Sequence, residues 1–168
     1  HNRANRDADA RLVSLLSFAK DLTLQFRAER ALDVSEARYA AIFRNSHAVM
    51  LIMDPESLEI VDANPAAEAF YGWPLASLQR MRISDINIFP PERIRAEMQA
   101  ARAAARFHFD FRHRRADGSI RDVEVYSGPI VHESRTLLFS IVHDVSARKE
   151  AEATLRKLSS AVEESPES

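Results

Sequence analysis

FHFDFRHRRADGSIRDVEV, residues 107–125, is the stretch that decides the fold. Its first half alternates aromatic and polar residues, so Phe107, Phe109 and Phe111 are expected on one face of a β-strand. Asp117-Gly118 favours a tight hairpin turn, and the alternation resumes after it. The stretch therefore predicts two antiparallel strands. Because the rings alternate with His and Arg, a second interpretation stays open, a basic stacking surface for nucleic acid.

Three further strands are expected, two before this hairpin and one after it. The apolar runs 48–54 (AVMLIMD) and 58–64 (LEIVDAN) are separated by a turn that contains Pro55 and Ser57, which predicts a first hairpin. The run 136–145 (TLLFSIVHDV) is apolar on both faces and is therefore expected in the centre of the sheet.

Helices are predicted between the two groups of strands. Asn64 can cap a helix that has Pro65 in its first position and ends near Gly72. A second helix is expected from Glu92 to Ala105, after a Pro-Pro break. This order of elements predicts an α+β domain with one antiparallel sheet and the helices on one of its faces.

The two ends of the chain have the composition of long helices, without glycine and rich in Ala, Leu, Glu and Arg. Apolar residues recur there at spacings of three and four, as in the apolar seam of a paired helix. The alternative is an amphipathic helix that packs on its own domain. The N-terminal seam is Leu12, Leu15, Ala19, Leu22 and Phe26, and the C-terminal seam is Ala151, Leu155, Leu158 and Val162.

Composition limits the function. The net charge of −2 gives no general attraction to nucleic acid or anionic membranes, and no apolar run is long enough to span a bilayer. The absence of cysteine excludes thiolate chemistry and suits a reducing compartment, so a cytoplasmic location is expected. We found no phosphate-binding loop, nucleophile elbow or metalloprotease motif, so the chain is not expected to be an enzyme. It begins at His1 and is expected to be part of a longer protein.

Several phrases, in a specific order, resemble the PAS domain family. The run 46–73 is similar to the first half of a PAS domain, and 107–130 followed by 137–152 looks like the second half, the PAC motif. The likeness covers about Ser35 to Glu152. The phrases that carry it are Asn64-Pro65-Ala66, Phe70-Tyr71-Gly72-Trp73, Arg114-Arg115-Ala116-Asp117-Gly118-Ser119, Gly128-Pro129-Ile130 and the closing 143–149 (HDVSARK).

The resemblance implies a PAS-like five-stranded antiparallel sheet with short helices on one face and long helices at both ends. Residues 1–34 would be a helical linker or coiled-coil segment, 35–146 the PAS domain, and 147–168 a C-terminal signalling helix. Residues 37–47 and 156–166 also align at a fixed offset, so the chain could enter a second PAS repeat at its end. Chance similarity between two Ala-rich helices is the alternative.

PAS domains enclose a pocket for haem, flavin, a chromophore or a small metabolite. A covalent flavin adduct is disfavoured because it needs a cysteine, and haem because the helix 92–105 has no histidine and only Met98 as a soft ligand. A non-covalent flavin or a small metabolite remains open. For each pocket candidate, plain core packing is the alternative. The candidates are Met50, Ile52, Phe70, Trp73, Ile86, Ile94, Met98, Phe109, Val125, Phe139 and Ile141.

The resemblance also implies a signal hinge where the last strand meets the C-terminal helix. Asp144 and Ser146 match the Asp-x-Ser/Thr phrase that connects related sensors to their output helix, and Asp144 is expected to pair with Arg148 or Lys149. A simple strand-to-helix cap is the alternative.

Two functions follow from the resemblance. The first is a sensory input module of a bacterial sensor histidine kinase or diguanylate cyclase, which dimerises through its flanking helices and has PAS or effector domains as neighbours. The second is a ligand-free PAS domain that acts only as a dimerisation or spacer element. Neither involves nucleic acid or membrane contact by this part of the chain.

Overall fold

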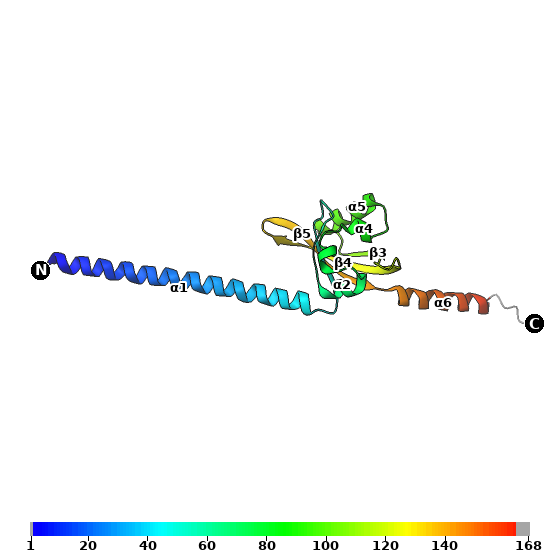
Figure 1. Ribbon diagram of the computed structural model, residues 1–168, viewed down its shortest axis with the longest axis horizontal. Helices are drawn as coiled ribbons and strands as arrows, with labels where there is room; N and C mark the ends of the chain where they lie inside the picture. Colours follow the sequence, from blue (N-terminus) through cyan, green and yellow to red (C-terminus); the bar gives the residue numbers. More distant parts are fainter. Residues whose placement is uncertain (1, 164–168) are drawn as a thin grey trace, which may run out of the picture. The chain divides into compact units, whose positions relative to one another are not determined.

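The computed structural model describes residues 2–163, with side chains from residue 9 onward. Figure 1 labels the long helices α1 (Asn2–Asn45) and α6 (Ser146–Glu163), and the remaining elements follow α1 and precede α6 in the sequence. The strands are β1 (Val49–Met53), β2 (Ile60–Ala63), β3 (His108–Arg114), β4 (Ile120–His132) and β5 (Arg135–Asp144). The short helices are α2 (Pro65–Tyr71), α3 (Leu75–Leu78), α4 (Ile83–Ile86) and α5 (Pro91–Arg102).

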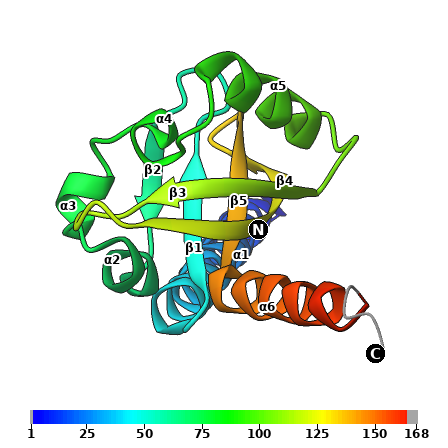
Figure 2. The ribbon, with the colours of Figure 1, turned by 90° about the vertical axis from the view of Figure 1, so that its right-hand side faces the viewer.

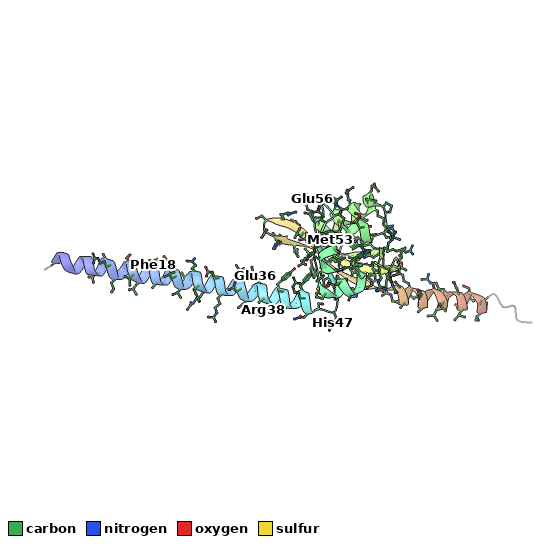
Figure 3. All side chains as sticks on the ribbon, viewed as in Figure 1. Phe18, Glu36, Arg38, His47, Met53 and Glu56 are labelled. Carbon is green, nitrogen blue, oxygen red and sulfur yellow. The ribbon has the colours of Figure 1, made fainter. Side chains whose placement is uncertain are left out.

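The chain forms two compact units, of which the first ends at Ile42 and the second begins at Phe43. Helix α1 makes up the first unit and continues through the boundary expected at residue 34 to end at Asn45. Its apolar seam is open to solvent, with Leu15 72% and Phe26 68% exposed. Side chains along this helix, including Phe18, project away from its axis (Figure 3).

The second unit is built on a five-stranded antiparallel sheet with the strand order β2-β1-β5-β4-β3 (Figure 2). β5 lies in the centre, which confirms the prediction made from its two apolar faces. The four short helices form an arc beside the sheet (Figure 2). The α+β fold with five strands, short helices and long terminal helices is therefore as predicted.

The stretch 107–125 forms the predicted hairpin of β3 and β4, with His108 opposite Tyr126 and Arg114 opposite Ile120. Its turn requires the conformational freedom of Gly118, whose φ is 83°. The expected row of three phenylalanines differs from the observed buried row in one residue. Phe109 and Phe111 are buried, but Phe107 precedes the strand and is 54% exposed, and His113 completes the buried row.

Helix α2 begins and ends as the sequence predicts. The Oδ1 atom of Asn64 accepts a hydrogen bond from the amide of Ala67 at 3.0 Å, and Pro65 occupies the first helical position. The helix ends at Gly72, which has a φ of 82°. A Cβ at Gly72 would approach the Cβ of Ala116 to 3.3 Å, so this helix end lies close to the β3–β4 turn.

Two apolar clusters cover the two faces of the sheet. The inner cluster fills the space between the sheet and the short helices and includes Leu51, Tyr71 and Ile94. The outer cluster covers the opposite face and consists of Phe43, Met50, Ile52 and Leu137, with less buried neighbours. We call these two faces the inner face and the outer face.

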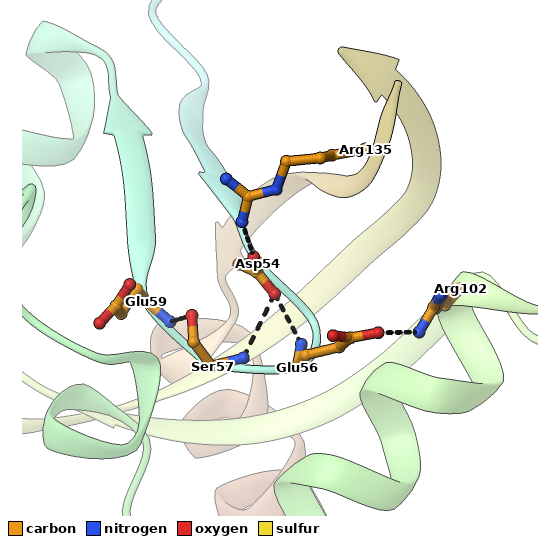
Figure 4. Close-up of polar contacts among 6 residues, drawn as sticks. All are labelled: Asp54, Glu56, Ser57, Glu59, Arg102 and Arg135. Carbon is orange, nitrogen blue, oxygen red and sulfur yellow. Dashed lines mark hydrogen bonds and ion pairs between the residues drawn. The ribbon is translucent and has the colours of Figure 1, made fainter. Parts of the chain in front are cut away.

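The β1–β2 turn is held by Asp54 (Figure 4). Its carboxylate accepts hydrogen bonds from the amides of Glu56 and Ser57 and pairs with Arg135 at the start of β5. Burial raises the pKa of Asp54, but these hydrogen bonds and Arg135 outweigh it and hold the pKa below its usual value. Glu56 pairs with Arg102 at the end of α5, so this turn is tied to both β5 and α5.

Candidate functional site

A small cavity lies between the inner face of the sheet and helices α4 and α5, with a volume of about 30 Å³. Its wall is mainly apolar, and its polar side chains are Asn87, Glu97, His113 and Ser127. A single water molecule needs about 10–15 Å³ of such space, whereas pockets for drug-sized ligands reach about 300–1,000 Å³. The cavity therefore has room for a molecule of a few atoms and would have to open for a flavin or a haem.

His113, which lines the cavity, forms a buried polar pair with Tyr71, and the two side chains are 2% and 0% exposed. The Tyr71 hydroxyl lies 2.9 Å from His113 Nδ1. Burial raises the pKa of Tyr71 and lowers the pKa of His113 to about 3, because both charged forms would lose their hydration. Both groups are therefore neutral at neutral pH. His113 Nε2 is buried and has no hydrogen-bond partner among the described residues.

Four of the predicted pocket residues line this cavity: Ile94, Met98, Phe109 and Val125. They come from α5, β3 and β4, which the fold brings together on the inner face. Phe70, Trp73 and Ile86 belong to the same inner cluster but are not part of the cavity wall.

The other four predicted pocket residues lie on the outer face. Met50, Ile52, Phe139 and Ile141 pack around the outer cluster with Phe43. In β1 and β5 the inner face instead carries Leu51, Met53, Leu138 and Val142. The alternation assumed for these strands is therefore shifted by one residue. Both faces of β1 and β5 are apolar, so the sequence pattern does not distinguish them.

The prediction also missed the polar side chains of the cavity. His113 follows Phe109 and Phe111 at a spacing of two, so strand alternation alone could have placed it on their face. Asn87, Glu97 and Ser127 carried no comparable signal, because each reaches the cavity from a different element or loop.

The predicted hinge residues meet where β5 passes into α6. Ser146 is 8% exposed, and its Oγ atom accepts a hydrogen bond from the amide of Asp122 on β4 at 2.9 Å. The Asp144 carboxylate accepts from the amide of Ser146 at 3.0 Å, and the amide of Val145 donates to the Asp122 carbonyl at 2.9 Å. The first residue of α6 is thus bonded to both β4 and β5.

Charged pairs continue these contacts along the first turn of α6. Arg148 pairs with Glu124, and Lys149 Nζ lies 3.8 Å from the Asp122 carboxylate. The hydrogen bond from Arg148 lowers the pKa of Glu124. Asp144 pairs with Arg121 at 3.9 Å, instead of with Arg148 or Lys149 as expected from the sequence. The helix therefore faces β4 with its basic side chains, and Asp122 also pairs with Arg112 across the hairpin.

One group of side chains has the donor types of a metal site. The ligand atoms of His108, Asp110 and Glu124 lie within 4.8 Å of one another on the outer face of the β3–β4 hairpin. Glu124 is engaged by the Arg148 guanidinium, whose positive charge opposes a cation at the same carboxylate.

This fold and this site define a sensory domain of the PAS type. A model of the PAS domain family matches residues 46–147, which is more than half of the chain. The chain belongs to the PAS domain family.

Two relatives in sequence are multidomain signalling proteins. The chain is 34% identical over 139 residues to the diguanylate cyclase DgcM of Escherichia coli K12, covering 79% of this chain and 34% of that protein. It is 29% identical over 136 residues to the sensor histidine kinase TmoS of Ectopseudomonas mendocina, covering 76% of this chain and 14% of that protein. The chain thus spans about a third of DgcM and less of TmoS.

Solved structures share the fold. The PAS domain of an HTR-like protein from Haloarcula marismortui matches with a TM-score of 0.62 at 24% identity, covering 70% of this chain and 98% of that one. A PAS domain from a two-component sensor histidine kinase matches with a TM-score of 0.54 at 19% identity, covering 68% and 98%. Within residues 2–163, no helix offers a stretch that is both long and apolar enough to cross a bilayer.

Proposed function

We propose that this chain is the sensory input and dimerisation module of a larger signalling protein of the diguanylate cyclase or sensor histidine kinase type. In this proposal residues 35–146 sense a small ligand or partner in the cytoplasm, and residues 1–34 and 147–168 connect the sensor to its neighbours. The observation that carries it is the set of bonds between β4 and the start of α6, centred on Ser146 and Asp122.

These bonds provide a physical route from the sheet to the helix. Since Ser146 Oγ and the Asp122 amide are bonded directly, a change in the position of β4 changes where α6 can begin. A ligand or partner shifts this equilibrium only by its differential affinity for the two arrangements. The ion pair of Arg148 and Glu124 also ties the first turn of α6 to β4.

Replacing Ser146 by alanine tests this route. We expect the free energy of unfolding to fall by about 1 kcal/mol, because the Asp122 amide loses its acceptor. We expect amide hydrogen exchange to quicken in the first two turns of α6 and beside Asp122, measured by mass spectrometry on the full chain. Ser160→Ala, at an exposed position of the same helix, is the matched control. Unchanged exchange in the first turns would remove the proposed hinge.

The dimer rests on the two apolar seams. Leu12, Leu15, Leu22 and Phe26 are each at least 50% exposed on a helix of 44 residues, and a second copy of the chain offers an identical seam. Most helical stability in proteins comes from the packing of an apolar face, so a partner helix accounts for the spacing of these residues.

We expect the chain to reach twice its 19.0 kDa mass with rising concentration in multi-angle light scattering. The double change Leu15→Glu and Leu22→Glu should raise the dimer dissociation constant at least tenfold, because it buries charge in the seam. Leu24→Glu lies outside the seam spacing, at a residue that is 54% exposed, and should leave the constant nearly unchanged. A chain that stays monomeric at the highest concentrations would contradict the dimeric part of the proposal.

A second candidate is a ligand-free PAS domain that acts as a spacer, and the small volume of the cavity favours it. An absorbance scan of the purified chain, with mass spectrometry of the denatured sample, separates the two. A stoichiometric small molecule in the sample would exclude the spacer. Its absence, together with no response to added compounds, would favour it.

A further inference from the structure

His113 Nε2 is a buried polar atom that lacks a partner in the described chain. The side chain lines the cavity and is 2% exposed, so water at the protein surface does not serve it. A buried polar atom without a partner costs on the order of the free energy of a lost hydrogen bond, and such atoms are uncommon in folded proteins.

The contact between Tyr71 and His113 determines what this atom offers. If the Tyr71 hydroxyl donates to His113 Nδ1, the ring proton resides on Nε2, and only that N–H is left unpaired. If Nδ1 donates instead, both the phenol hydrogen and the Nε2 lone pair are left without partners among the described residues. The first arrangement satisfies more groups, so His113 presents an N–H donor at the cavity.

The charge at the cavity wall selects against ions. Glu97 contributes a carboxylate that is already paired with Arg106, and no side chain that lines the cavity is cationic at neutral pH, because His113 is held neutral. An anion would therefore find no partner of opposite charge in the wall. The rest of the wall is largely apolar and would not hydrate a cation. The adaptable side chains of Met53 and Met98 also line it, so the cavity can widen by a rotamer change.

We propose that this cavity binds a small uncharged molecule, such as a ketone, aldehyde or ester, whose oxygen accepts a hydrogen bond from His113 Nε2–H. This inference rests on the proposed sensory function and names the chemical class of its ligand. The bound oxygen supplies the missing partner of Nε2, and the apolar remainder of the molecule contacts the phenylalanine and aliphatic side chains of the wall.

Occupancy has a short path to the hinge. His113 lies opposite Arg121 in the β3–β4 register, and Arg121 pairs with Asp144, whose carboxylate accepts from the Ser146 amide. A ligand that fixes His113 would therefore restrain the pair of strands that holds the start of α6.

Three probes of nearly the same shape test the ligand class: acetone, isobutene and acetate. Acetone is uncharged and has a hydrogen-bond acceptor, isobutene is uncharged and has none, and acetate has acceptors but carries a negative charge. Titrations of the full chain are followed by NMR signals of the Ile94 and Met98 methyl groups. We expect saturable binding of acetone, at least tenfold tighter than that of isobutene or acetate. Long-range proton–nitrogen spectra of His113 should show the proton on Nε2.

Two substitutions of His113 form a matched pair. His113→Asn places an amide near the position of Nδ1, so it retains an acceptor for Tyr71 but removes the donor at Nε2. His113→Gln extends by one bond and restores an N–H near the position of Nε2. We expect acetone binding to weaken at least tenfold in His113→Asn and to recover largely in His113→Gln. Circular dichroism confirms that each variant is folded.

The proposal is overturned if the ring proton is on Nδ1, if isobutene or acetate binds as well as acetone, or if His113→Asn binds acetone normally. The binding signals come from the cavity and do not involve α6, so the ligand class and the relay to α6 are tested separately. Acetone binding without any change of hydrogen exchange in α6 would keep the ligand class and reject the relay. Faster exchange in Ser146→Ala without probe binding would do the reverse.

Discussion

Replacing Asn64 by alanine is expected to lower the free energy of unfolding by about 3 to 5 kcal/mol, because two buried backbone amides and one half-buried carbonyl each lose a hydrogen bond at once. Asn64 is 0% exposed. Its Oδ1 atom accepts from the amides of Met50 and Ala67, each at 3.0 Å, and its Nδ2 atom donates to the carbonyl of Ala48 at 2.8 Å.

Urea unfolding of the full chain, followed by circular dichroism, measures this effect. Asn45→Ala removes the same side chain from an exposed position and should change the free energy of unfolding by less than about 0.5 kcal/mol. Asn64→Asp keeps the acceptor for both amides but cannot donate to Ala48, so it isolates the loss at that carbonyl. A loss below about 1 kcal/mol in Asn64→Ala would show that these bonds do not hold the domain together.

Asn64 illustrates why part of the fold was predictable. Its role as the cap of α2 is local, because the capped amide belongs to Ala67, three residues further on. Its bonds to Met50 and Ala48 join α2 to β1 across fourteen or more residues, and no short-range pattern indicates them. The same contrast holds at Asp117-Gly118, where the turn was evident from two residues.

The site was harder to predict than the fold. Strand alternation tells which residues share a face, but a strand that is apolar on both sides does not reveal which face meets the helices. This is why Leu51 and Met53 line the cavity although Met50 and Ile52 were chosen. β3 has polar residues on one face, and there Phe109 was placed on the cavity side from sequence alone.

The hinge shows a third limit. The approach of Ser146 to Asp122 was not evident, since the two residues are 24 apart in sequence and meet only through the pairing of β4 with β5. The basic residues after Ser146 were recognised, but their partners were assigned to Asp144, the nearest carboxylate in sequence. In the fold, Glu124 and Asp122 on β4 lie closer to Arg148 and Lys149.

The free energy of unfolding is expected to fall by about 2 kcal/mol between about pH 8 and about pH 5, because of His113 alone. Its pKa is about 3 in the folded chain, lowered by burial, against an ordinary value of 6.5. Below pH 6.5 this histidine takes up a proton in the unfolded chain, but in the folded chain it stays neutral until the pH approaches 3. The contribution of His113 to the free energy of unfolding is therefore fully present above pH 6.5, and it is lost as the pH falls toward the pKa of the folded chain.

The groups around His113 support this direction. Tyr71 is neutral, and burial is the cause of the lowered pKa of His113. Glu97, across the cavity, is the one carboxylate of its wall and would favour protonation, but it is paired with Arg106 at 3.2 Å. Asp54 has a lowered pKa, and its contribution is lost only below its ordinary value of 3.8, outside this range of pH.

Urea unfolding at a series of pH values compares the natural chain with His113→Gln. The variant lacks the titrating ring, so its free energy of unfolding should vary by about 2 kcal/mol less over the same range. His132→Gln, at an exposed position of β4, should retain the full pH dependence, because it leaves His113 and its surroundings unchanged. If the natural chain and His113→Gln lose stability in parallel, His113 takes up its proton in the folded protein, and the dry, neutral pair with Tyr71 does not exist in solution.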